Sequence, residues 1–103
     1  MGSHPNWLFG KDGALLRASA NGYADLAEEL LKAGARPDVK SANGVTPLHR
    51  AAQNGHRKTV ELLLKNDAPA ACRTVDGATP ADMAESNGHN SIALFLRGYE
   101  SPE

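Results

Sequence analysis

Apart from His4, which lies in an apparent tag remnant, three histidines and one cysteine have the side-chain types that best suit metal binding or nucleophilic catalysis. They are His49, His56, Cys72 and His89. Their spacing matches no zinc-site motif, in which cysteines or histidines come in closely spaced pairs. A cysteine nucleophile needs an activating neighbour, and the sequence places none beside Cys72. We therefore expect no catalytic residue, no metal site and no cofactor, and we interpret the histidines as structural.

Composition and charge exclude several further classes of protein. The 103 residues suffice for one small domain. Eleven Lys and Arg against twelve Asp and Glu leave a formal charge of -1, so no overall positive field draws the chain to nucleic acid or to a membrane surface. Aromatic residues make up only 5%, which argues against a stacking surface for single-stranded nucleic acid. No apolar stretch approaches the roughly 20 residues that span a bilayer.

Four residue types recur three times each along the chain, always at the same spacing. The matching sets are Gly22, Gly55 and Gly88; Leu30, Leu63 and Leu96; Ala18, Ala51 and Ala84; Asn21, Asn54 and Asn87. A fixed period in the range of roughly 20 to 50 residues is typical of stacked repeat proteins. One such unit cannot bury its apolar face alone, so neighbouring units must cover it.

The middle unit, residues 44–76, predicts a pair of antiparallel helices. Thr46 before Pro47 supplies an N-cap hydroxyl and a proline at the first helical position, where its missing N–H costs nothing. A short helix of small residues then ends at Asn54-Gly55, since glycine adopts the left-handed conformation that closes a helix.

A second, longer and amphipathic helix is predicted to begin near Arg57. Glu61 and Lys65 on its outer face have the spacing of an ion pair within one helix. One position on its apolar side is polar in the middle unit and apolar in the outer two. The residues there are Leu26, Thr59 and Ile92. We expect this layer of second helices to be core and not a binding groove.

Two segments between the units predict tight turns. Asn43-Gly44 and Asp76-Gly77 are strong hairpin signals, in which both residues of the dipeptide take positive φ. We therefore expect two exposed fingers. Val45 and Val75 would be apolar residues at their tips, where an exposed apolar group suits the centre of an interface.

The middle unit closely resembles the ankyrin repeat. The resemblance rests on the run from Gly44 to Ala52, on Gly55-His56 and on Leu62 to Leu64. It covers about residues 13–97. It implies an all-α, helix-turn-helix solenoid of three repeats with projecting β-turn fingers. The fingers and the concave face of the first helices are the surfaces through which such proteins usually bind other proteins.

The resemblance also divides the chain. The expected segments are a tag remnant and N-terminal apolar lid (residues 1–12, with Trp7, Leu8 and Phe9 as the lid), a single domain (13–98, with units of about 13–43, 44–76 and 77–98), and a C-terminal tail (99–103). The first and third units depart from the motif and are expected to act as caps.

Two departures from the repeat carry physical consequences. Arg97 stands at the register of Leu31 and Leu64, so a position that a further unit would cover is charged, and we expect the array to end there. Asp67 stands where the first unit has Gly34. Because aspartate adopts the left-handed conformation less readily than glycine, the loop at Asp67 should be strained by roughly 1 kcal/mol.

Long side chains recur at one register of the first helices. Arg17, Arg50 and Met83 occupy it and would suit an acidic partner. The whole candidate binding surface is Arg17, Lys40, Asn43, Val45, Arg50, Gln53, Asn54, Arg73, Val75, Asp76, Ala78, Met83, Ser86 and Asn87.

The resemblance implies a non-catalytic protein-interaction module, either an adaptor or an inhibitor, that presents this surface in a rigid form. We expect it to be a monomer. One alternative is a structural spacer or an engineered scaffold without a natural partner. Another is binding of RNA or a small anionic ligand through Arg17, Lys40, Arg50 and Arg73. A single cysteine and no signal peptide point to the cytoplasm or nucleus.

Overall fold

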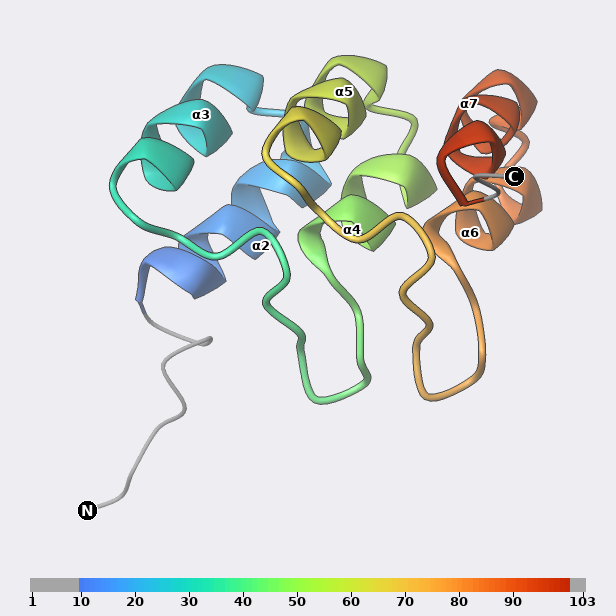
Figure 1. Ribbon diagram of the computed structural model, residues 1–103, viewed down its shortest axis with the longest axis horizontal. Helices are drawn as coiled ribbons and strands as arrows, with labels where there is room; N and C mark the ends of the chain where they lie inside the picture. Colours follow the sequence, from blue (N-terminus) through green and yellow to red (C-terminus); the bar gives the residue numbers. More distant parts are fainter. Residues whose placement is uncertain (1–9, 101–103) are drawn as a thin grey trace.

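The chain folds into a stack of helix pairs. The structure is a computed structural model that describes the backbone of residues 10–100 and the side chains of residues 10–99. Within this part the elements are six helices and no strand: α2 (Lys11–Asn21), α3 (Ala24–Lys32), α4 (Pro47–Gln53), α5 (Arg57–Lys65), α6 (Pro80–Ser86) and α7 (Asn90–Glu100). Each odd-numbered helix packs on the helix before it, and the pairs stack in chain order (Figure 1). The predicted all-α solenoid of three units is confirmed.

The first helices of the second and third units begin at threonine, as predicted. Thr46 Oγ1 accepts a hydrogen bond from the backbone N–H of His49, and Thr79 Oγ1 accepts one from Asp82. In return, the His49 ring accepts the N–H of Thr46, and the Asp82 carboxylate accepts that of Thr79. In α2 the corresponding residue is Gly10, which has no side chain to make a cap. These reciprocal bonds fix the direction in which α4 and α6 leave the fingers.

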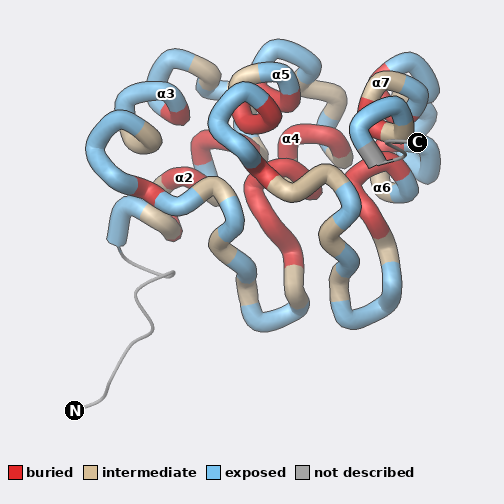
Figure 2. Tube along the Cα trace, in the orientation of Figure 1, coloured by how far each residue is buried: buried red, intermediate tan, exposed pale blue. Residues whose placement is uncertain are grey.

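The core lies between two layers of helices. One layer is α2, α4 and α6, the other is α3, α5 and α7, and the buried segments face each other between them (Figure 2). Small, buried alanines let the first helices approach closely, as at Ala18, Ala51 and Ala84. Contacts between α3 and α5 are sparser than those between α2 and α4. The layer of first helices is therefore the concave side of the stack.

The outer face of α5 differs from the prediction. Glu61 pairs with Arg57, whose Nε lies 3.0 Å from Glu61 Oε2, and not with Lys65. The same guanidinium lies over the ring of Phe95 in α7, 4.6 Å from its centroid. Arg57 is one turn before Glu61 and so offers the equivalent spacing, and its second contact with Phe95 holds it there.

The second-helix layer is less uniformly buried than the sequence suggested. Thr59 and Ile92 are buried, at 0% and 5% exposed, but Leu26 at the same register is 48% exposed. The prediction that Leu26 belongs to the core was wrong. Thr59 belongs to α5, which packs against α3 of the preceding unit, whereas no helix pair precedes the first unit among residues 10–100.

The described helices extend past the expected limits of the domain at both ends. Helix α2 starts at Lys11, two residues before the expected boundary, and α7 continues to Glu100. Lys11 Nζ donates a hydrogen bond to the carbonyl of Ala33, 2.8 Å away, and so ties the start of α2 to the end of α3. The expected apolar lid, residues 7–9, lies outside the described residues.

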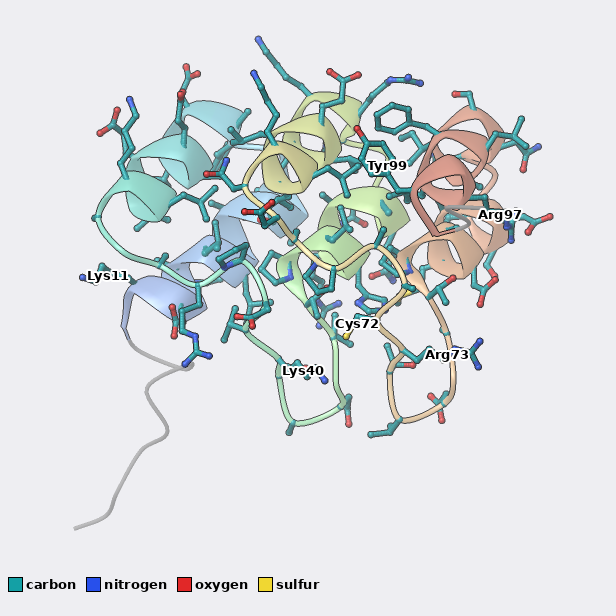
Figure 3. All side chains as sticks on the ribbon, in the orientation of Figure 1. Lys11, Lys40, Cys72, Arg73, Arg97 and Tyr99 are labelled. Atoms are coloured by element: carbon teal, nitrogen blue, oxygen red, sulfur yellow. The ribbon has the colours of Figure 1, made fainter. Side chains whose placement is uncertain are left out.

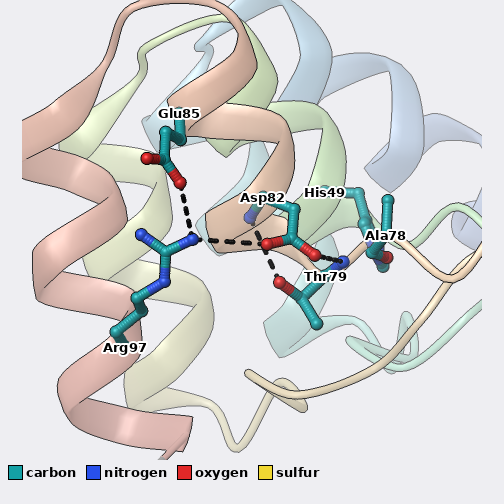
Figure 4. Close-up of polar contacts among 6 residues, drawn as sticks. All are labelled: His49, Ala78, Thr79, Asp82, Glu85 and Arg97. Atoms are coloured by element: carbon teal, nitrogen blue, oxygen red, sulfur yellow. Dashed lines mark hydrogen bonds and ion pairs between the residues drawn. The ribbon is translucent and has the colours of Figure 1, made fainter.

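An ion-pair cluster covers the face of the third unit that points away from the stack. Arg97 Nη2 lies 2.7 Å from Glu85 Oε1 and 3.3 Å from Asp82 Oδ1 (Figure 4). The residues at these three registers in the middle unit are His49, Ala52 and Leu64, all of which are buried. The charged cluster thus replaces the packing surface on which a neighbouring unit sits. That the array ends here stays a prediction.

Thr59 carries a buried hydroxyl with no hydrogen-bond partner. Replacing it with a methyl group of the same shape removes an unpaired polar atom from the core. We expect Thr59→Val to raise the free energy of unfolding by about 1 kcal/mol, measured by urea denaturation. Thr46→Val is the control, because its hydroxyl is bonded and its loss should lower stability. A less stable Thr59→Val protein would contradict the argument.

Asp67 is the one non-glycine residue of the described chain with positive φ, at 70°. The strain predicted for its loop follows from the close approach of its side chain to the backbone in this conformation. Asp67→Gly should therefore raise the unfolding free energy by about 1 kcal/mol in the same assay. Asn66→Gly is the matched control, because φ of Asn66 is -100° and glycine there should only destabilise. Equal effects at the two sites would refute the strain argument.

Candidate protein-binding surface

The first finger, residues 40–45, is a turn closed by one serine. The Ser41 backbone N–H donates to the carbonyl of Val45 at 2.9 Å, and the N–H of Gly44 donates to the carbonyl of Ser41 at 2.9 Å. The Ser41 hydroxyl oxygen accepts the N–H groups of Asn43 and Val45. The turn is thus held by its own backbone and by a side chain at its base.

The second finger, residues 73–78, repeats this arrangement around a threonine. The backbone N–H of Thr74 donates to the carbonyl of Ala78, 2.9 Å away. Its hydroxyl oxygen accepts the N–H groups of Asp76 and Ala78. Sequence reasoning missed both hydroxyl residues, although Ser41 and Thr74 stand one repeat period apart and the repeat itself could have revealed them.

Positive φ occurs in the fingers only at their glycines. It is 78° at Gly44 and 85° at Gly77, and neither Asn43 nor Asp76 has positive φ. The prediction that both residues of each dipeptide take this conformation was wrong. Ser41 and Thr74 are the first of four turn residues, so glycine is the last, where a type I turn favours it.

The two fingers are joined to each other. The backbone N–H of Val75 donates to the carbonyl of Asn43, 3.0 Å away. A Cβ on Gly44 would lie only 3.2 Å from Cα of Thr74, so the absence of a side chain permits this close approach. The spacing of the fingers is therefore fixed by direct contact between them.

The ring of His49 joins α4 to the second finger. Its Nδ1 lies 3.1 Å from the backbone N of Thr46 and accepts that N–H, while Nε2 lies 2.9 Å from the carbonyl oxygen of Ala78. The ring is therefore neutral, with its proton on Nε2. Burial lowers the pKa of His49 below 6.5, and the nearby positive charges of Arg50 and Lys40 lower it further, against the opposing effect of its backbone bonds.

The other histidines also sit at the joints between units. His56 Nε2 lies 3.1 Å from the carbonyl oxygen of Ala20, which also accepts a hydrogen bond from Asn54 Nδ2 at 2.8 Å. A Cβ on Gly22 would lie 2.5 Å from the His56 ring, and one on Gly55 would meet His89 in the same way. The bonds of His49 and His56 confirm that these two rings bridge adjacent units.

The structure separates the predicted binding residues by exposure. Exposed are Arg17, Lys40, Asn43, Asn54, Arg73, Val75, Asp76, Ser86 and Asn87; half-buried are Arg50, Gln53, Ala78 and Met83. Figure 3 shows Lys40 and Arg73 on successive fingers. Val75 is 72% exposed, as predicted.

Val45 is not exposed, contrary to the prediction. It is only 7% exposed, because it follows the turn glycine and leads directly into α4, where it packs at the base of the finger. Val75 instead precedes its glycine and lies within the turn itself. Asn54 and Asn87 are exposed, but each side-chain amide already donates to a backbone carbonyl, of Ala20 and Met83.

Stability should fall as the pH drops below 6.5, because of His49. The unfolded chain protonates this residue near pH 6.5, whereas the folded chain does so only at lower pH, since its pKa is lowered. The unfolded state thus binds more protons in that window and is favoured there, while above it the contribution is constant. Urea unfolding from about pH 8 to about pH 5 measures this, and His49→Gln should flatten the pH dependence. Equal pH slopes in the two proteins would contradict the assignment.

Comparison with known proteins agrees with this architecture. No helix among the described residues is both long and apolar enough to cross a membrane. The curated proteins include no match to the chain. The model of the family described as ankyrin repeats, in three copies, matches residues 15–102. Ankyrin repeats are in general non-catalytic protein-interaction modules. With nearly the whole described stack inside that match, the chain belongs to the ankyrin repeat family.

Proposed function

We propose that this chain binds a protein partner across its two fingers and the concave face of its first helices. The observation that carries the proposal is that hydrogen bonds within the chain hold this surface together without a partner. The fingers bond to each other through Val75 and Asn43, and the second finger bonds to α4 through His49. A surface ordered in advance loses little conformational entropy on binding.

The exposed groups of this surface suit an interface. Val75 offers an apolar contact surrounded by polar and charged side chains, the usual arrangement of an interface centre and its rim. The fingers also carry long cationic side chains, Lys40 on the first and Arg73 on the second, and both are exposed. We propose that the module acts as a monomer. Its single cysteine fits a reducing compartment, the cytoplasm or nucleus.

Two other functions would give different results in the experiment described below. A structural spacer or engineered scaffold would retain no specific partner. An RNA-binding module would retain nucleic acid through its cations, with steep dependence on salt. Adaptor and inhibitor both lie within the proposal, because each acts by occupying a surface of its partner.

We expect a Val75→Glu/Arg50→Glu variant to lose the partner protein that the unchanged chain retains from cell extract. Both changes alter exposed or half-buried positions, so thermal unfolding should remain close to that of the unchanged chain. The readout is quantitative mass spectrometry of the retained proteins, with nuclease added to remove RNA-dependent retention.

Leu94→Glu/Lys58→Glu is the matched control for that experiment. It replaces an exposed apolar residue and a cation on the layer of second helices, and Leu94 at 71% is as exposed as Val75. The control should retain the partner. If all three proteins retain the same set, or none retains any protein, the finger surface is not the binding site and the spacer function gains support.

A further inference from the structure

Cations recur at two registers of the concave side. Lys40 and Arg73 are one repeat period apart and occupy the same place on successive fingers (Figure 3). Arg17 and Arg50 are also one period apart and occupy the same place on α2 and α4. Positive groups therefore repeat at the spacing of one unit, once along the fingers and once along the helices.

Most carboxylates of this side are already engaged. Four of the five on the fingers, their flanks and the first helices have partners: Asp12 with the backbone N–H of Arg36, Asp38 with the Arg36 side chain, and Asp82 and Glu85 with Arg97. Asp76 is the fifth. Lys40, Arg50 and Arg73, in contrast, form no ion pair with a carboxylate among residues 10–99.

The cations of the first finger and of α4 act on one region. Lys40 and Arg50 both lower the pKa of His49, although burial is the larger cause, and so both stand near the base of that finger. Arg50 Nη1 also lies 3.4 Å from Gln53 Oε1, within reach of a weak hydrogen bond. That contact leaves the other N–H groups of the guanidinium available to a carboxylate.

The contact between the fingers sets the distance that a partner must match. Stacked helices lie about 8–10 Å apart, and the bond from Val75 to Asn43 keeps the fingers at the spacing of the units. An extended chain in the polyproline II conformation rises about 3.1 Å per residue with three residues per turn. Side chains three residues apart in such a segment thus lie on one side, about 9 Å apart.

We propose that the partner presents an acidic, extended segment whose carboxylates, three residues apart, pair with Lys40 and Arg73, with a further carboxylate on Arg50. This inference rests on the proposed function, since it names the kind of partner that the same surface binds. Val75, which is exposed two residues after Arg73 on the second finger, meets an apolar residue of the segment.

The surface favours an acidic protein segment over a nucleic acid. Single-stranded nucleic acids are held by stacking of bases on aromatic side chains as well as by charge. The exposed aromatic residues of the described chain are Tyr23, just before α3, and Tyr99 in α7. Both belong to the other layer, so bases would find no stacking surface beside the fingers within residues 10–99.

The test measures binding of labelled peptides to the whole chain by fluorescence anisotropy at low salt. One peptide of about twelve residues repeats Glu-Pro-Ala, which favours the extended conformation and places a glutamate at every third position. Its isomer has the same residues rearranged so that no two glutamates stand three residues apart. We expect the spaced peptide to bind about tenfold more tightly than the isomer.

Two neutralised variants locate the contact. Lys40→Gln/Arg73→Gln should weaken binding of the spaced peptide about tenfold. Lys32→Gln/Lys65→Gln is the control, because it removes equal charge at equal spacing from exposed positions on α3 and α5 and should leave binding unchanged. Equal losses in the two variants would reduce the effect to net charge and overturn the proposal.

The remaining outcomes separate this inference from the proposed function. Equal binding of the two peptides would overturn the spacing argument. If neither peptide binds while Val75→Glu/Arg50→Glu still loses its protein partner, the finger surface binds proteins but the acidic segment is wrong. An RNA oligonucleotide that binds more tightly than the spaced peptide, with steep salt dependence, would overturn the proposal in favour of nucleic acid.

Discussion

The joint between successive units is the contact on which the rest of this molecule depends. Helices α2, α4 and α6 pack through alanine, so they approach closely and bury one another. The same closeness brings the backbone of one unit within reach of the next, where His56 and Asn54 donate to the carbonyl of Ala20. Because both joints among residues 10–100 share the alanine packing, the distance between the fingers follows from the distance between the helices.

The third position of the first helix shows how one residue combines two tasks. In the middle unit His49 closes the helix cap with Nδ1 and reaches the second finger with Nε2. In the third unit Asp82 makes the same cap with one carboxylate oxygen and turns the other toward Arg97 (Figure 4). Both residues complete the cap, and His49 also donates a hydrogen bond to the finger that follows its helix pair. The pKa of Asp82 lies below its ordinary value, first because its carboxylate accepts the backbone N–H of Thr79 and also because Arg97 lies beside it.

The packing of the units also determines which charged side chains are paired. Acidic groups of the third unit are drawn into the cluster with Arg97, away from the fingers. The cations of the fingers and of α4 have no comparable set of carboxylates beside them among residues 10–99. Burial of His49 as a neutral ring keeps the finger bonded to the helix without adding a further positive charge at that place. The contacts of His49 and Arg97 thus hold the second finger against α4 and keep the carboxylates of α6 paired away from the fingers.

The sequence by itself determined the period, the helix starts at Thr46 and Thr79, and the helix ends at glycine, because these depend on local conformation and on spacing along the chain. Tertiary structure decided which residues at equivalent registers are covered. Leu26 is exposed where Ile92 is buried, since exposure depends on what packs against a position. It also decided the partner of Glu61, because Arg57 is held by a ring from the next unit. Local rules depend only on residues that are close in the sequence, whereas burial and ion pairing depend on surfaces that meet only when the units stack.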